Sequence, residues 1–322
     1  MLGIEALEVE MGHLVDGTWK NDAVVTSDDK GKFKREESHF RESISPNHER
    51  YQPEKDRYHL YVSYACPWAH RTLITRKLKG LENVISVDVV HPDMLEHSWT
   101  FRSDFPESTG DRLYNKDYLY QIYQKDNPKI TCKVTVPVLW DKKTESIVNN
   151  ESSEIIRLFN SSFEDFSKNK IDLYPKSLRA EIDQVNELTY EPINNGVYKT
   201  GFAKNQEAYD EAFETLFKAL EKIESRLSQS NCLVGGQLTE ADIRLATTLL
   251  RFDSVYYLHF KCNFKKIAEY PAISSYLKRL YSMEAFSSTT HLSHIKRHYY
   301  FSHKFINPYQ IVPRGPSSDL LF

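Results

Sequence analysis

The stretch that decides the fold is residues 58–72, which read YHLYVSYACPWAHRT. The apolar and aromatic run at its start predicts a short buried β-strand, and the pattern after Pro67 predicts an α-helix. Proline is favoured in the first turn of a helix, where it removes no backbone hydrogen bond. Cys66 therefore stands where the strand passes into the helix, beside unpaired backbone N–H groups and the positive end of the helix dipole. This position favours the thiolate and predicts a lowered pKa for Cys66.

The thiol at position 66 has no second cysteine close to it. A redox Cys-X-X-Cys motif would place one at position 69, where the chain carries Ala69. Cys66 therefore cannot close a local disulfide, and its chemistry needs a thiol from another molecule, for which glutathione is the obvious candidate. A buried structural cysteine is the alternative interpretation. His70 could act as a base on the same helix, although a structural histidine is the more common case.

The composition is that of an ordinary globular protein. The 322 residues are 40% hydrophobic and 27% charged, and this length predicts two domains. The net charge of −3 argues against nucleic acid as a partner. The four cysteines are far apart and fit no zinc spacing, and the helically spaced His291, His294 and His298 lack a nearby acidic ligand. We therefore expect no metal site.

The sequence shows no recognisable targeting segment. Its first eight residues, MLGIEALE, carry acids where a secretory signal would carry bases. No apolar run approaches the length of a membrane span. The cysteine usage suits a reducing compartment better than a disulfide framework. We expect a cytoplasmic protein that has no membrane partner.

The order of the predicted elements indicates the architecture of the first half. Residues 1–45 are polar and predict an arm laid over a domain, and residues 46–165 predict a compact α/β unit. Residues 91–131 form a long excursion, which is usually functional or disordered. The strands and helices predicted around it follow the order βαβ…ββα, which is the thioredoxin-like arrangement. They are the strand and helix at 58–79, a parallel strand at 84–90, strands at 134–140 and 145–148, and a helix that begins near residue 150.

The last part of the chain, residues 176–322, predicts an all-helical domain. Thr239 and Asp242 form a predicted capping box at the start of one of its helices. An α/β thioredoxin-like domain followed by an all-α domain is the architecture of the glutathione transferases. The predicted helices cover residues 177–192, 205–229, 239–258 and 270–282.

Two further motifs fit the binding of a peptide-like thiol. In a thioredoxin-like unit Pro137 is expected to be cis, which leaves the backbone N–H and C=O of Val136 open to an added strand. An ordinary edge-strand proline is the alternative. Glu151 and Ser152 open the next helix, where they could receive the ammonium and carboxylate groups of the γ-glutamyl end of glutathione. Plain N-capping explains the same two residues equally well.

At these residues the chain resembles a known family, over nearly its whole length. It is similar to the glutathionyl-hydroquinone reductases, also called Xi-class or omega-like glutathione transferases. The Cys-Pro motif alone would indicate only the wider superfamily, whereas the later strings are specific to this family. The strings are GxFxR at 31–35, YACPWAHR at 64–71, VTVPVLW at 134–140, NESSEIIR at 150–157, GVYKTGFA at 196–203, LTEADIRL at 238–245, HFKC at 259–262, HYY at 298–300 and INP at 306–308.

The resemblance implies roles for individual residues. Cys66 would be the nucleophile and Tyr198 the proton donor, and Tyr256 and Tyr299 would hydrogen-bond the thiolate and the substrate oxygens. Tyrosines at helical spacing are more often core residues, and composition does not choose between the two readings. Glutathione would be held by Trp99, Lys133, Val134, Thr135, Val136, Pro137, Glu151 and Ser152.

One of these positions departs from the family pattern. The family usually has arginine where this chain has Lys133. Lysine keeps the positive charge but lacks the planar two-pronged fork of a guanidinium group. We therefore expect carboxylate binding at this position to be weaker or differently shaped.

The same resemblance implies an activity and an assembly. The activity is the removal of glutathione from a glutathionyl-hydroquinone, or a related quinone-derived substrate, through a mixed disulfide on Cys66. Glutathione is then the co-substrate, and the chain is expected to form a homodimer through residues 206–314. The alternative is an omega-like thiol transferase or dehydroascorbate reductase, which needs Cys66 but not the three tyrosines. A non-enzymatic interaction module of the same fold is a third reading.

Overall fold

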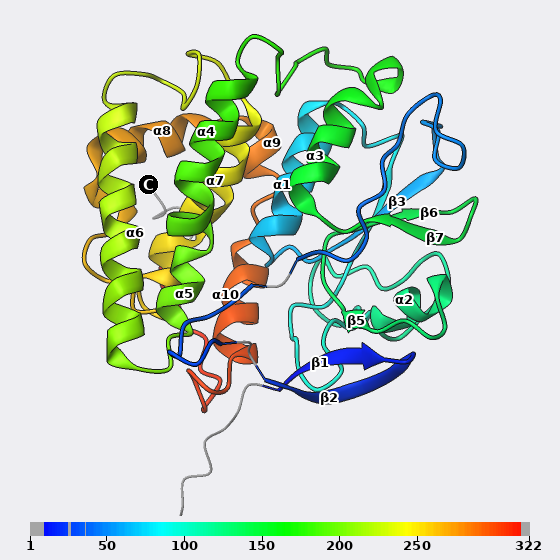
Figure 1. Ribbon diagram of the computed structural model, residues 1–322, viewed down its shortest axis with the longest axis horizontal. Helices are drawn as coiled ribbons and strands as arrows, with labels where there is room; N and C mark the ends of the chain where they lie inside the picture. Colours follow the sequence, from blue (N-terminus) through cyan, green and yellow to red (C-terminus); the bar gives the residue numbers. More distant parts are fainter. Residues whose placement is uncertain (1–9, 25–26, 36, 317–322) are drawn as a thin grey trace, which may run out of the picture.

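The structure, a computed structural model, describes residues 10–24, 27–35 and 37–316. Helices gather on one side of the molecule and strands on the other, with α1 (Pro67–Leu78) between them (Figure 1). Two hydrophobic cores follow this division, one around the strands and one among the helices. The predicted combination of a thioredoxin-like unit and a helical unit is confirmed, whereas the boundaries given to the two domains stay predictions.

The main sheet has four strands in the order β4-β3-β6-β7. Its strand β3 (Tyr58–Val62) is buried along its whole length and runs parallel to β4 (Ser86–Val89). On its other side β3 pairs antiparallel with β6 (Val138–Asp141), which in turn pairs antiparallel with β7 (Ser146–Asn149). These pairings confirm the predicted parallel strand and the predicted hairpin.

The predicted strand at 134–140 begins later than expected. It starts at Val138, because Pro137 has no N–H group to contribute to the ladder. After the hairpin the chain enters α3 (Ser152–Ser161), which packs beside α1 (Figure 1). The element order around the sheet is therefore the thioredoxin-like order that the sequence predicts.

The segment before the main sheet is more regular than predicted. Residues 10–24 form a hairpin of β1 (Glu10–Val15) and β2 (Thr18–Val24), and both residues of its Asp16-Gly17 turn have positive φ. Asp-Gly is a strong hairpin signal, and the prediction of an arm over residues 1–45 did not use it. A second, three-stranded sheet forms where β5 (Cys132–Lys133) pairs with β1.

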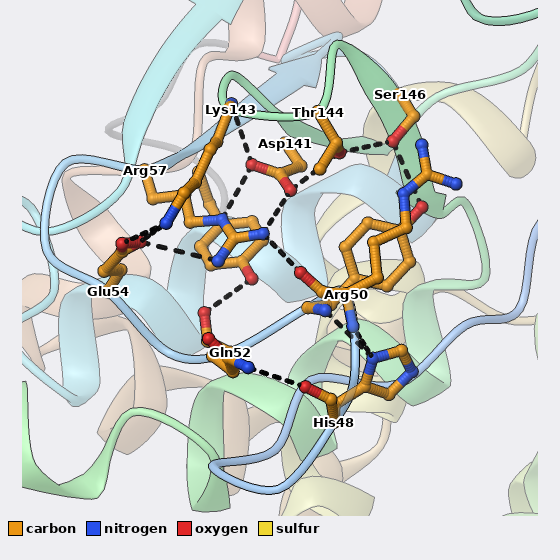
Figure 2. Close-up of polar contacts among 11 residues, drawn as sticks. His48, Arg50, Gln52, Glu54, Arg57, Asp141, Lys143, Thr144 and Ser146 are labelled. Atoms are coloured by element: carbon orange, nitrogen blue, oxygen red, sulfur yellow. Dashed lines mark hydrogen bonds and ion pairs between the residues drawn. The ribbon is translucent and has the colours of Figure 1, made fainter.

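The next part of the chain runs along the edge strand β7 and the start of α3, where the N–H group of Glu42 donates to the carbonyl of Val148 at 3.0 Å. The N–H group of Phe40 donates to Asn150 Oδ1 at 3.0 Å. The buried Arg57 then donates to both carboxylate oxygens of Asp141, at 2.9 and 2.6 Å. Figure 2 shows how this ion pair and its neighbours join the chain before β3 to the hairpin of β6 and β7. A charge buried in this way is stabilised by its direct counter-charge.

The long excursion at residues 91–131 is ordered and packs on α10 (Leu292–Ser302). His298 of α10 donates from Nδ1 to the carbonyl of Pro92 at 2.9 Å. Its ring also stacks on Trp99, with the ring centroids 4.9 Å apart. The excursion therefore connects the strand side of the molecule to its last helix.

The predicted C-terminal helices are confirmed, with corrections at two of their ends. The capping box of Thr239 and Asp242 starts α7 as predicted. However, α4 and α7 end early, because the chain turns into the π-helical segments η2 (Tyr190–Asn194) and η3 (Phe252–Tyr256). Such segments are rare and occur frequently at functional sites. None of the described helices is long and apolar enough to cross a membrane. The remaining helical elements are α2 (Tyr120–Asp126), η1 (Glu164–Phe166), α4 (Arg179–Thr189), α5 (Gly196–Gly201), α6 (Gln206–Leu227), α7 (Glu240–Arg251), η4 (Ile267–Glu269), α8 (Pro271–Tyr281) and α9 (Glu284–Ser287).

The burial of His298 predicts a loss of stability in acid. Burial lowers the pKa of His298 to about 4, from an ordinary value of 6.5. As the pH falls below 6.5 the unfolded chain binds this proton before the folded protein does, so the free energy of unfolding decreases toward pH 4. The full effect is about 3 kcal/mol. Urea unfolding at pH 7 and pH 4.5 should show a smaller decrease in His298→Gln than in the parent. The same change at the exposed His39 controls for the loss of one histidine, and an equal decrease in all three proteins would contradict the assignment.

Candidate active site

Cys66 occupies the N-cap position of α1, with Pro67 in the first turn of the helix. This confirms the predicted placement at the junction of strand and helix. Its side chain is half-buried, and Sγ lies 3.6 Å from the carbonyl oxygen of Val136. The Val136-Pro137 peptide bond is cis, as predicted. The fold thus places the backbone of Val136, seventy residues away in the sequence, directly beside the thiol.

The predicted direction of the Cys66 pKa is wrong for this structure. Burial raises the pKa of the Cys66 thiol, and this effect exceeds the opposing ones. The opposing effects are the backbone N–H groups of Ala69 and Trp68 and the positive charges of Arg251 and Arg35. The N–H groups at the start of the helix therefore lower the pKa of Cys66 as predicted, but the increase caused by desolvation is larger.

Three tyrosines form a hydrogen-bonded cluster close to the thiol. The hydroxyl group of Tyr299 lies 2.5 Å from that of Tyr198 and 3.0 Å from that of Tyr256. All three side chains are buried, and burial raises the pKa of each phenol. The negative charge of a Cys66 thiolate is a further cause that raises the pKa of Tyr198. The phenols are therefore neutral at ordinary pH and can donate protons or hydrogen bonds.

The two π-helical segments bring these tyrosines together. Tyr198 lies in α5, directly after η2, and Tyr256 is the last residue of η3. Tyr299 comes from α10, which packs against η3. The cluster therefore unites three segments that are separated by about fifty residues each in the sequence.

Glu151 acts as the N-cap of α3, which confirms the capping interpretation. One carboxylate oxygen accepts from the N–H group of Ser153 at 2.9 Å, and the other accepts from the hydroxyl of Ser38 at 2.9 Å. Burial alone would raise the pKa of Glu151, but these hydrogen bonds and the positive charge of Arg71 lower it overall. Glu151 is therefore a carboxylate at neutral pH. The hydroxyl of Ser152 is buried and accepts from Arg71 at 3.4 Å.

A cavity of about 820 Å³ opens between the arm, α3 and the helical side. Six of the predicted glutathione-binding residues line it: Lys133, Thr135, Val136, Pro137, Glu151 and Ser152. Trp99 is not among them, because it is buried against His298. Val134, Cys66 and the three tyrosines are also absent from the lining, although Val136 joins the cavity to the thiol.

Sequence reasoning missed the contribution of Arg35, which belongs to the arm. Arg35 donates from Nε to Asn195 Oδ1 at 2.8 Å. Its guanidinium carbon lies 4.6 Å from the ring centroid of Trp68 and 5.2 Å from that of Tyr198. Together with Ser38, it lets the arm form one wall of the cavity and contact both sides of the molecule. The GxFxR string at 31–35 was the only sequence signal for this role.

His70 is a structural residue, in agreement with the more common case. It is fully buried, and its Nδ1 accepts a hydrogen bond from Arg251 at 3.1 Å. The proton is therefore on Nε2, which donates to Thr289 Oγ1 at 2.9 Å. Burial lowers the pKa of His70 far below its ordinary value, and both ring nitrogens are already engaged. Among the described residues, no group of three or more His, Cys, Asp or Glu side chains could hold a metal ion.

Comparisons with known proteins show the family of this chain. A family model described as the glutathione S-transferase N-terminal domain matches residues 65–162, and one described as the C-terminal domain matches residues 206–279. The chain is 50% identical to glutathionyl-hydroquinone reductase YqjG of Escherichia coli, over 96% of this chain and 97% of that protein. It is 55% identical to glutathione S-transferase omega-like 2 of Schizosaccharomyces pombe, over 89% of this chain and 94% of that relative.

Solved structures give the same result. The glutathione S-transferase Xi of Phanerochaete chrysosporium superposes with a TM-score of 0.89 at 52% identity, covering 91% of this chain and 96% of that one. The glutathione-bound structure of YqjG from Escherichia coli superposes with a TM-score of 0.88 at 48% identity, covering 97% of each chain. This chain therefore belongs to the glutathione S-transferase family, in the group formed by the Xi-class enzymes and the glutathionyl-hydroquinone reductases.

Proposed function

We propose that this enzyme removes glutathione from glutathionyl-hydroquinones and releases hydroquinone and oxidised glutathione. The observation that carries the proposal is the cluster of three neutral phenols behind a single thiol. A simple thiol transferase has no use for such proton donors, whereas breaking a bond between carbon and sulfur on an aromatic ring requires one. The relative named glutathionyl-hydroquinone reductase, at 50% identity, supports the same reaction.

Glutathione is proposed to bind in the 820 Å³ cavity with its cysteine along the backbone of Val136. The γ-glutamyl end would reach the start of α3, where Glu151 is ionised and backbone N–H groups begin the helix. Lys133, which also lines the cavity, would meet the other carboxylate. Solved structures of related proteins from Escherichia coli and Saccharomyces cerevisiae are described with glutathione bound, which supports this ligand.

The proposed reaction has two stages. The Cys66 thiolate attacks the glutathione sulfur, the bond between that sulfur and the ring carbon breaks, and its electron pair passes to the ring. Tyr198 donates a proton to the ring carbon, which leaves hydroquinone and a mixed disulfide of Cys66 with glutathione. A second glutathione thiolate then attacks this disulfide, releases oxidised glutathione and restores Cys66. Tyr256 and Tyr299 would stabilise the oxygens and the sulfur during these steps through hydrogen bonds.

A homodimer in a reducing compartment, the cytoplasm, is part of the proposal. The large hydrophobic side chains that the described surface exposes all fall within residues 206–314, the segment expected to form the interface. Association of two copies there would remove this apolar surface from water. The exposed side chains are Leu258, Phe264, Met283, Tyr309 and Ile311.

Replacement of the nucleophile tests the chemistry. Cys66→Ala should lower the rate of hydroquinone release by at least about 10³-fold, because the mixed disulfide forms on Cys66. The other thiol at the cavity, Cys132, is a poor substitute, since burial raises its pKa to about 12. Cys66→Ser should lose the same reaction, since a serine hydroxyl does not attack sulfur. We also expect this variant to gain ordinary conjugating activity. The measurement is hydroquinone release from a purified glutathionyl-hydroquinone, with mass spectrometry for a glutathione adduct on Cys66 of the parent. Normal turnover by Cys66→Ala would refute the mechanism.

Replacement of the proton donor separates the reductase from a thiol transferase. Tyr198→Phe should slow the reaction on a glutathionyl-hydroquinone by about 100-fold, the usual contribution of a general acid. The reduction of a mixed disulfide of glutathione should be nearly unaffected, because a thiolate leaving group needs no protonation at carbon. No loss on either substrate would instead favour the omega-like thiol transferase. Equal losses on both would show that Tyr198 supports the site in general and is not the specific proton donor.

Glu151 provides the test of the glutathione site. Glu151→Gln keeps an oxygen that can accept from Ser153 but removes the negative charge. We expect the free energy of unfolding to change by less than about 1 kcal/mol and the Kd of glutathione to increase about tenfold. Ser38→Ala, which removes the other partner of the carboxylate, is the matched control for loss of a hydrogen bond. An unchanged Kd in Glu151→Gln would show that Glu151 acts only as a helix cap.

A further inference from the structure

Arg251, at the end of α7, is a completely buried arginine that reaches the catalytic loop. Its Nε donates to the carbonyl oxygen of Ala65 at 2.8 Å, and Nη2 donates to that of Tyr64 at 3.1 Å. These two residues directly precede Cys66. The remaining group, Nη1, donates to the carbonyl of Thr247 at 2.7 Å and to His70 at 3.1 Å. One side chain of the helical core therefore holds the backbone that presents the thiol.

All of these partners are neutral acceptors, which is unusual for a buried cation. Among the described residues, no Asp or Glu forms an ion pair with Arg251. Arg57, which is also buried, shows how a buried arginine is usually neutralised. Its Nε and Nη2 both donate to the carboxylate of Asp141 (Figure 2). A guanidinium group stays charged, and an isolated charge in the interior is costly. The positive charge of Arg251 is thus available to a negative charge that forms during the reaction.

The position of Arg251 couples the thiol to the phenols. It is the last residue of α7, and the π-helical segment η3 that follows it ends at Tyr256. The charge of Arg251 lowers the pKa of Cys66, of Tyr256 and of Tyr299, against the larger opposite effect of burial in each case. His70 cannot supply a positive charge beside Cys66, because its Nδ1 accepts a hydrogen bond from Arg251 and burial keeps the ring neutral.

Other titratable groups also face this region, from the arm and from four helical elements. Arg35 adds a positive charge near Cys66, but it lies at the wall of the cavity, where the arm is pinned to Asn195. Arg71 donates to Ser152, to Asn194 and to the carbonyl of Arg244, and it also interacts electrostatically with a Cys66 thiolate. These groups include Arg35 from the arm, Tyr64 and His291 beside His70, His70 and Arg71 from α1, Tyr198 from α5, Tyr256 from η3, and His298 and Tyr299 from α10.

We infer that Arg251 is a positioning residue that fixes the Cys66 loop and supplies the buried counter-charge for the thiolate. The inference deepens the proposed function, because it names the group that offsets the burial of the nucleophile. The attraction between Arg251 and Cys66 would form only when the thiol ionises. Because the buried cation has no other counter-charge among the described residues, this attraction lowers the free energy of forming the thiolate. The same charge would stabilise negative charge on the phenols after Tyr198 has donated its proton.

The test is the pH dependence of Cys66 alkylation by iodoacetamide, followed on this residue by mass spectrometry in the full chain. Arg251→Gln should move the inflection of the rate to higher pH by at least about one unit, a tenfold loss of thiolate at neutral pH. Arg251→Lys keeps the charge but cannot hold both carbonyls. Its inflection should stay within about half a unit of the parent's, while the rate of hydroquinone release falls.

A buried arginine elsewhere provides the matched control. Arg57→Gln removes another buried guanidinium group, one that lies before β3 and contacts Asp141 and not the Cys66 loop. It should lower the thermal stability and leave the alkylation profile unchanged. A folded Arg251→Gln protein with the parent's inflection would overturn the inference, and so would an Arg251→Lys protein that behaves like Arg251→Gln. If Arg251→Gln does not fold, an upward shift of a full unit in Arg251→Lys decides against the role of the charge. Because alkylation needs no glutathionyl substrate, this result is independent of whether the parent reduces glutathionyl-hydroquinones.

Discussion

The constraint on which the rest of the structure depends is the burial of α1 between two cores. Ala69 and Leu73 belong to the core around the main sheet, whereas Ile74 belongs to the core among the helices. The helix therefore cannot shift without disturbing both cores, and the residue at its start is held in place from both sides. Since Cys66 is that residue, the packing that stabilises the fold also sets the position of the thiol. The carbonyl of Val136 lies beside the thiol, and the side chain of Arg251 binds the carbonyl of Ala65, the residue before Cys66.

The same burial has opposite chemical consequences for the groups of the site. It raises the pKa of the three phenols, which keeps them protonated and suits them to donate. It also raises the pKa of Cys66, which opposes the thiolate that the proposed reaction needs. The N–H groups at the start of α1 and two buried or half-buried cations act against this cost. The structure thus places the thiol and the three phenols in one region, where burial favours the protonated form of each group.

Most of the fold around the thiol could be predicted from local patterns. The strand and helix on either side of Cys66, the parallel strand, the hairpin and the capping box at Thr239 all depend on residues close in sequence. The hairpin of β1 and β2 was equally predictable from Asp16-Gly17, and was overlooked. The π-helical segments η2 and η3 were not predictable, because a single extra residue in a helical turn leaves the apolar pattern almost unchanged. Yet these segments place Tyr198 and Tyr256.

The sequence by itself determined which chemistry is present: one thiol at a helix start, no second cysteine beside it, and a proline before β6 whose cis form agrees with the thioredoxin-like pattern. These properties depend on neighbours a few residues apart. Only the tertiary structure decided that Tyr198, Tyr256 and Tyr299 share hydrogen bonds and that Trp99 is buried away from the cavity. It likewise decided that Arg251, which has no carboxylate partner within the described part of the chain, binds the backbone just before the thiol. It also decided the direction of the Cys66 pKa, because desolvation depends on everything that packs around a group, whereas the helix dipole depends on one turn of chain.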